Sequence, residues 1–148
     1  MLWGEVVHDG PTTRELPALV ARLAKQRQSP IGYDPASLGA LDIIDAIARN
    51  HRDVKTVALT TGQYGAACLA VDSALRAGTF AHSRQAPLDA AVEVATKRPL
   101  GDGGFGWGRK TSAGNIAPLV AVTIAARMFD ALPRPRRSSG ILLPSSTG

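Results

Sequence analysis

The chain has 148 residues, a length that accommodates one domain with one hydrophobic core. Apolar residues make up 45% of it and charged residues 20%, which is a globular composition and excludes a wholly disordered chain. No apolar stretch approaches the ~20 residues of a membrane span, and the N-terminal segment lacks the features of a secretory signal. We therefore expect a cytoplasmic protein that has no membrane partner.

The net charge of +5 is unevenly distributed. Residues 97–148 carry eight Lys or Arg against two Asp, whereas residues 1–96 carry nine basic and ten acidic side chains. A basic segment on a nearly neutral body suits a polyanionic partner, because each phosphate contact releases counterions. The alternative is that the surplus serves solubility alone.

The hydrophobic pattern predicts strands and helices in alternation. A T-x-x-E capping box precedes the first helix, Asp34-Pro35 precedes the second, and Gly78 follows the third. The expected strands lie at 2–8, 30–33 and 54–59, and the expected helices lie at about 13–27, 35–48, 62–77, 87–97 and 116–132. This order predicts an α/β fold with a short, mostly parallel sheet flanked by helices.

Two further segments interrupt or follow this pattern. Residues 101–108 (GDGGFGWG) are too rich in glycine for a helix and predict a loop or an irregular hairpin. Residues 133–148 contain Arg134, Arg136 and Arg137 and predict a flexible basic tail beyond a domain at 1–132.

Asp34 and Asn115 are the first candidates for a functional site, because each comes directly before a predicted helix. Sites in open α/β sheets gather beyond the carboxyl ends of strands, where Asp34 would lie, and a carboxylate there could hold Mg²⁺. The alternative for Asp34 is that its side chain only caps the following helix. Asn115 is a weaker metal ligand, and its position alone predicts a cap.

Four basic side chains flank the glycine-rich segment and are candidate DNA contacts. They are Lys97, Arg98, Arg109 and Lys110. With Phe105 and Trp107 between them, they fit contact with a nucleic-acid backbone. The alternative is a surface hairpin with one buried aromatic anchor.

Cys68 and His82 are reactive residue types without an evident reaction. Cys68 is the only cysteine and has apolar neighbours, which predicts a buried structural residue. His82 could act as an acid or base in a small α/β enzyme together with Asp34, but no nucleophile accompanies it, which favours a structural role.

Several segments taken together resemble the C-terminal nuclease domain of the large subunit of tailed-phage terminases. The resemblance covers roughly residues 30–125 in order and spacing. The matching segments are Tyr33-Asp34-Pro35, Thr61–Cys68 (TGQYGAAC), Phe80-Ala81-His82, Pro87–Val92 (PLDAAV), Arg98–Asp102 (RPLGD), Trp107-Gly108-Arg109 and Asn115–Ala121 (NIAPLVA).

The resemblance implies an RNase H-like fold with a two-metal site for Mg²⁺ or Mn²⁺ that cuts double-stranded DNA during packaging. It also implies partners among other terminase or portal components. Asp34 would be one metal ligand, whereas Asn115 stands where the family has its closing carboxylate. Residues 2–8 correspond to the third strand of that fold, so the first two strands and their aspartate are missing.

The resemblance leaves two hypotheses, which are compatible. One is a terminase nuclease domain that is inactive or impaired as an isolated chain, because two of three expected carboxylates are absent. The other is a non-catalytic DNA-binding or packaging-assembly module. An incomplete sheet would also expose a strand edge, which predicts self-association or completion by another polypeptide.

Overall fold

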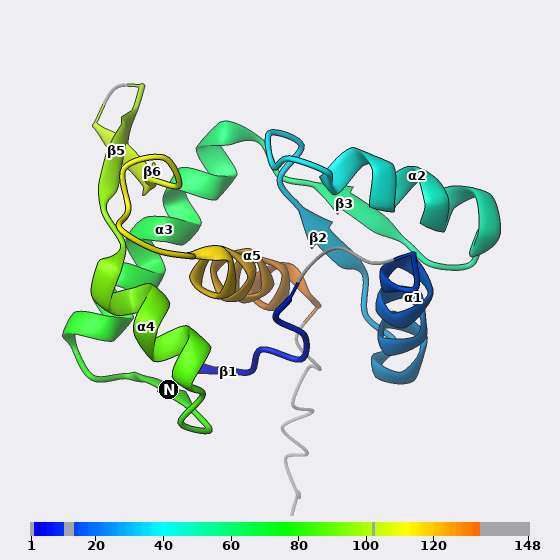
Figure 1. Ribbon diagram of the computed structural model, residues 1–148, viewed down its shortest axis with the longest axis horizontal. Helices are drawn as coiled ribbons and strands as arrows, with labels where there is room; N and C mark the ends of the chain where they lie inside the picture. The colour runs from blue at the N-terminus through cyan, green and yellow to red at the C-terminus, as the bar shows by residue number, and fades with distance from the viewer. Residues whose placement is uncertain (1, 11–13, 102, 134–148) are drawn as a thin grey trace, which may run out of the picture.

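The computed structural model describes residues 2–10, 14–101 and 103–133, and in these ranges five helices alternate with six short strands (Figure 1). The strands are β1 (Leu2–Gly4), β2 (Ile31–Tyr33), β3 (Thr56–Ala58), β4 (Phe80–His82), β5 (Lys97–Leu100) and β6 (Gly104–Trp107). The helices are α1 (Leu16–Arg27), α2 (Ala40–Asn50), α3 (Thr61–Arg76), α4 (Ala86–Val94) and α5 (Ala117–Ala131). The predicted α/β class is confirmed. No helix in these ranges combines the length and the apolar character that crossing a bilayer requires.

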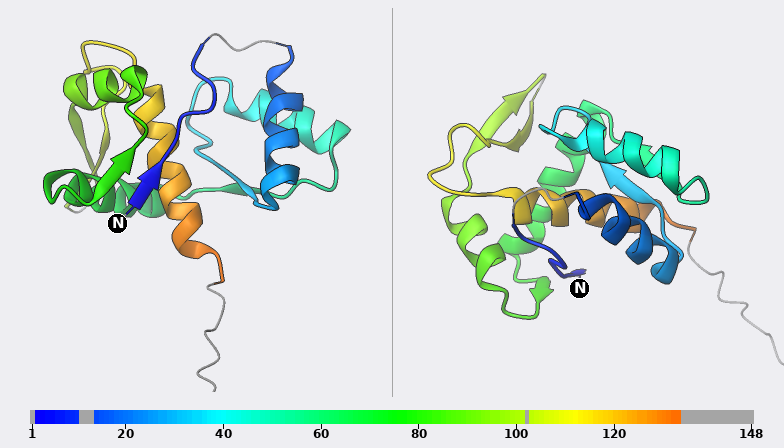
Figure 2. Two further views of the ribbon diagram at one scale, coloured as in Figure 1. Left: turned by 90° about the horizontal axis from the view of Figure 1, so that it is seen from below. Right: turned by 45° about the vertical axis from the view of Figure 1, so that its right-hand side comes forward.

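The strands form three separate pairs and not the single sheet that the strand order predicted. β1 pairs with β4 and β2 pairs with β3, both in parallel, whereas β5 and β6 form an antiparallel hairpin. The two parallel pairs lie on either side of α5, as Figure 2 shows. Each approaches α5 through a glycine: a Cβ on Gly4 would lie 3.1 Å from Val122, and one on Gly32 would lie 2.9 Å from Ile124. Because glycine has no side chain, the two strands can approach α5 this closely.

The ends of α3 and the position of the hairpin were predicted well. Thr60 and Gln63 form a reciprocal capping box at the start of α3. Gly78 follows the last turn with a φ of +66°, the left-handed conformation that favours glycine. β5 and β6 pair as a hairpin, which was one of two expectations for the glycine-rich segment.

Three predicted boundaries were wrong for local reasons. The second helix begins at Ala40 and not after Pro35, because Gly39 has a φ of +78°, which a helix cannot contain. The fourth helix ends at Val94, since Lys97 pairs instead with Trp107 in the hairpin. The first strand ends at Gly4, although the backbone of Val6 is still held by the Gln85 side chain at 2.6 and 2.7 Å.

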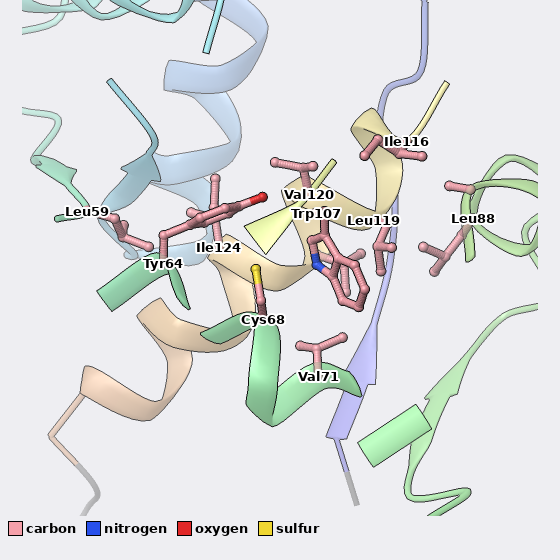
Figure 3. Packing of buried hydrophobic residues seen from close by; sticks show 12 residues of the cluster. Leu59, Tyr64, Cys68, Val71, Leu88, Trp107, Ile116, Leu119, Val120 and Ile124 are labelled. Carbon is pink, nitrogen blue, oxygen red and sulfur yellow. The ribbon is translucent and has the colours of Figure 1, made fainter. Parts of the chain in front are cut away.

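The main core lies between α3, α4, α5 and β6 (Figure 3). Cys68 and Leu119 are buried in it, and Trp107 donates a hydrogen bond of 2.9 Å to Thr123. Thr123 is itself fully buried and donates to the Leu119 carbonyl oxygen at 2.8 Å. The prediction that Cys68 is buried is thus confirmed.

The predicted tail at 133–148 lies outside the described residues apart from Pro133, and so does the Thr12 part of the first capping box. Within α1, Pro17 lies in the first turn, where a missing amide hydrogen disrupts no helical bond.

Candidate functional site

A groove of about 1170 Å³ separates the two parallel strand pairs. One wall comes from β1 and the residues after it, the other from β2, and part of the lining comes from α5. Asp34, Arg109 and Asn115 all line it, although they are far apart in the sequence. The structure therefore brings three of the predicted site residues to one groove.

Asp34 follows β2 directly and is held by its neighbours and by Arg109. One carboxylate oxygen accepts a hydrogen bond of 2.9 Å from the Ala36 amide. The other accepts 3.1 Å from Arg109 and a longer contact of 3.5 Å from the Ser37 hydroxyl. The Asp34 side chain is only 13% exposed, so its charge is matched mainly by the guanidinium. Asp34 does not cap α2, which was the alternative role for its side chain, because it closes a turn six residues before that helix begins.

The Asn115 side chain binds the backbone at the start of α5. Its side-chain oxygen accepts a hydrogen bond of 3.0 Å from the Ala117 amide, which has no partner inside the helix. Its amide nitrogen donates at 3.4 Å to Asp9. Asn115 thus binds the first amide of α5 from one residue before the N-cap position, which Ile116 occupies. Asp9 is a neighbour that sequence reasoning missed. No signal in the sequence links positions 106 residues apart.

The residues present do not fit a two-metal site. No three His, Cys, Asp or Glu side chains come together in the ranges that the structure describes. A cation at Asp34 would compete with Arg109 for the same carboxylate oxygen. Mg²⁺ sites rely on one or two carboxylates that are free to bind the metal. The described residues therefore do not fit the two-metal site that the resemblance implies.

The four predicted DNA contacts lie on and directly after the β5–β6 hairpin. Lys97 and Arg98 belong to β5, and Arg109 and Lys110 follow β6. Arg98 and Lys110 are exposed and form no ion pair with another described residue. Arg109 is bound to Asp34, and Lys97 is bound to Asp72 at 2.6 Å. The hairpin thus presents two cations that are shared with carboxylates and two that pair with no carboxylate in the described part of the chain.

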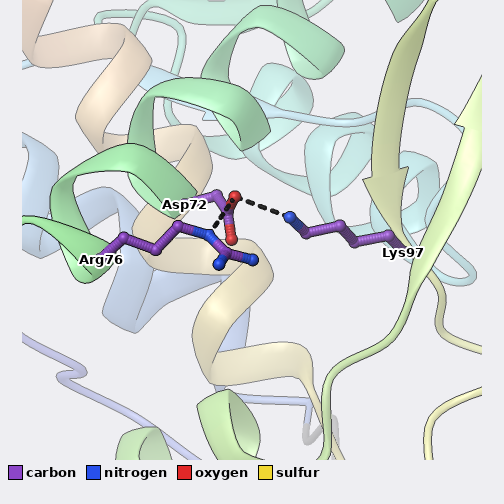
Figure 4. A network of polar contacts seen from close by, with 3 residues as sticks. All are labelled: Asp72, Arg76 and Lys97. Atoms are coloured by element: carbon purple, nitrogen blue, oxygen red, sulfur yellow. Dashed lines mark hydrogen bonds and ion pairs between the residues drawn. The ribbon is translucent and has the colours of Figure 1, made fainter.

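Lys97, Asp72 and Arg76 form a polar network that joins the hairpin to α3 (Figure 4). Asp72 accepts from Lys97 at 2.6 Å and from Arg76 at 3.0 Å. Burial alone would raise the pKa of Asp72, but the hydrogen bonds and charges of Lys97 and Arg76 lower it below its ordinary value. This network fixes the base of the hairpin.

The two aromatic side chains of the hairpin pack against each other, and Lys97 packs against one of them. Trp107 is buried, and the Phe105 ring lies edge-on to it with 5.3 Å between centroids. The Lys97 ammonium lies 4.4 Å above the Phe105 ring. Trp107 is therefore the buried anchor that was the alternative for this segment, and it is not available for stacking on bases.

The other reactive groups do not line the groove. His82 contacts Asp89 at 3.2 Å and does not line the groove that Asp34 lines. Cys68 is fully buried, and burial raises the pKa of its thiol. The Tyr64 hydroxyl is buried with no hydrogen-bond partner among the described residues, and burial raises the pKa of this group as well.

Comparison with known proteins gave no match: no family model, no curated protein and no solved structure is similar to this chain.

Proposed function

We propose that this chain is a DNA-binding domain related to the terminase nucleases, with an RNase H-like ancestry and an impaired metal site. The supporting sequence features are the ordered motifs between residues 30 and 125. The supporting structural features are the α/β order and the position of Asp34 at the end of a parallel strand, facing a groove. In this proposal the chain contacts double-stranded DNA without cutting it.

One observation carries the proposal: Arg109 forms an ion pair with Asp34 at 3.1 Å. A guanidinium at this carboxylate neutralises the charge that a divalent cation would need. The same arginine belongs to a group of four basic side chains around one hairpin, where phosphate oxygens can be bound. The pair therefore favours DNA binding over metal-dependent cleavage.

The basic group accounts for affinity and not for sequence preference. Side chains that contact phosphates position a protein on a duplex, whereas sequence is read from base edges. Trp107 is buried, so this aromatic side chain of the hairpin does not supply stacking on bases. We expect binding that depends strongly on salt and weakly on sequence.

Fluorescence anisotropy with a labelled 20-base-pair duplex tests this proposal. Replacing Arg98 and Lys110 by Ala should weaken binding and reduce the slope of log K against log salt by about 2, because two phosphate contacts are lost. The matched control replaces Arg22 and Arg49, which are exposed on α1 and α2, and changes the net charge equally. Equal weakening by both double variants would mean that only net charge matters and would overturn the proposed surface.

Calorimetry with Mn²⁺ tests the metal part of the proposal separately. The native chain should give no specific heat of binding, and Asp34→Ala should give the same trace. Stoichiometric binding that Asp34→Ala abolishes would contradict the impaired site.

A further inference from the structure

The walls of the groove are the open edges of two parallel strand pairs. On the β1 side, the Leu2 amide donates to Thr79 at 2.9 Å, and Gln85 binds the backbone of Val6. Since main-chain groups alternate along a strand, the N–H and C=O groups of Trp3 and Glu5 point to the opposite side. β1 therefore turns an unused edge away from β4.

The β2 side has the same arrangement. The Ile31 amide donates to Lys55 at 2.9 Å, and the Tyr33 carbonyl oxygen accepts from Leu59 at 2.9 Å. By the same alternation, the main-chain groups of Gly32 point away from β3. Within residues 2–10, 14–101 and 103–133, neither Trp3 nor Glu5 nor Gly32 takes part in a hydrogen bond to a strand on its open side. Two unused edges thus border one groove.

The groove also gathers apolar surface that a folded chain normally covers. Seven large apolar residues are exposed in the described part of the chain. Four of these line the groove, and they are Trp3, Val7, Leu38 and Phe129. An apolar patch between two open strand edges has the properties of a strand-binding site.

We propose that residues 139–144 (Ser-Gly-Ile-Leu-Leu-Pro) of this same chain bind in the groove as an additional strand. The apolar run Ile141–Leu143 has three residues, the same length as β1 and β2. Gly140 and Pro144 bound it, and proline cannot continue a strand that is paired on both sides. A run without alternation suits a central strand whose two faces are both covered.

The point where the described chain ends favours this segment over other occupants. α5 begins near Asp34, since Arg109 and Asn115 lie at that end, and Met128 lies against Gly32. Its last turn is therefore at the amino ends of β1 and β2, where Leu132 lines the groove. A segment that leaves the end of α5 and enters the groove from the amino ends of β1 and β2 would run parallel to both strands. Residues 134–139 would connect the end of α5 to the start of the added strand, and they span up to about 20 Å when extended.

Hydrogen exchange of single amides, followed by NMR on the whole chain, tests the proposal. The amides of Trp3, Glu5 and Gly32 should exchange at least about tenfold more slowly in the native chain than in Leu142→Asp, because the variant places a charge in the added strand. Ser145→Asp changes the charge equally just outside the strand and should leave the native protection intact. Amides of α3 serve as the internal reference for folding.

Two results would overturn the proposal. Equal exchange at the three amides in the native chain and in Leu142→Asp would mean that residues 139–144 do not bind there. Protection that disappears on dilution would mean that the strand comes from a second copy. The test is independent of DNA binding, because neither Leu142 nor Ser145 belongs to the basic group on the hairpin.

Discussion

The two sides of the groove differ in how much of each is buried. On one side, α3, α4, α5 and β6 enclose a cluster of twelve buried apolar residues. On the other side, α1 and α2 contribute only three buried apolar residues, Ala21, Ile44 and Ile47, and Leu38 and Leu41 are exposed. The difference indicates that the larger side folds around its own core, whereas the smaller side depends on its contact with α5.

The largest expected effect is a loss of unfolding free energy when a buried residue of the main core is truncated, compared with the same change on the smaller side. Leu119→Ala removes a side chain at the centre of the main cluster and should cost about 4 kcal/mol of unfolding free energy. Ile47→Ala, at an equally buried position on the smaller side, should cost about 2 kcal/mol because its surroundings are closer to solvent. Urea unfolding followed by circular dichroism measures both. Equal losses would remove the distinction between the two sides.

An intermediate effect is expected at the contact between the smaller side and α5. Gly32→Ala would place a Cβ 2.9 Å from Ile124 and equally close to the sulfur of Met128, and should cost about 2 kcal/mol. Gly62→Ala is the matched control, since its Cβ would meet nothing within 4 Å and alanine favours the helix. Thermal unfolding should shift down for the first and not for the second. A Gly32→Ala chain as stable as the control would mean that β2 does not depend on α5.

The smallest expected effect concerns the network that holds the hairpin on the larger side. Asp72→Asn should cost at most about 1 kcal/mol at pH 7, because Lys97 and Arg76 are 39% and 72% exposed. The lowered pKa of Asp72 means that this stability is present above its ordinary value of 3.8 and disappears as the pH falls below it. Urea unfolding between pH 7 and pH 3 should show the native chain and the variant converging. A constant difference would contradict the ionic origin.

The sequence predicted well the elements that depend on neighbouring residues. The third helix was expected at 62–77 with Gly78 after it, and α3 ends at Arg76 before Gly78. Its start is fixed within one turn by Thr60 and Gln63, a capping box that was not itself predicted. The start of α2 was misplaced because the side chain of Asp34 closes a turn and Gly39 has a left-handed φ. Neither conformation follows from hydrophobic spacing.

The sequence predicted individual residues of the candidate site but not how they are arranged in space. Asp34 and Arg109 were each singled out, but their pairing spans 75 positions and depends on the packing of β2 against α5. The same holds for the division of the strands into separate pairs, since hydrophobic alternation is the same in one sheet as in several. Tertiary contacts, which no local pattern encodes, decide both.

The most direct test of the proposed function is an agarose gel of supercoiled plasmid incubated with the purified chain and Mn²⁺. We predict that the plasmid band shifts upward with increasing protein and that no open-circular DNA forms after the protein is removed. Open-circular DNA that appears with the native chain and not with Asp34→Ala would contradict the account, because Asp34 would then support cleavage despite Arg109.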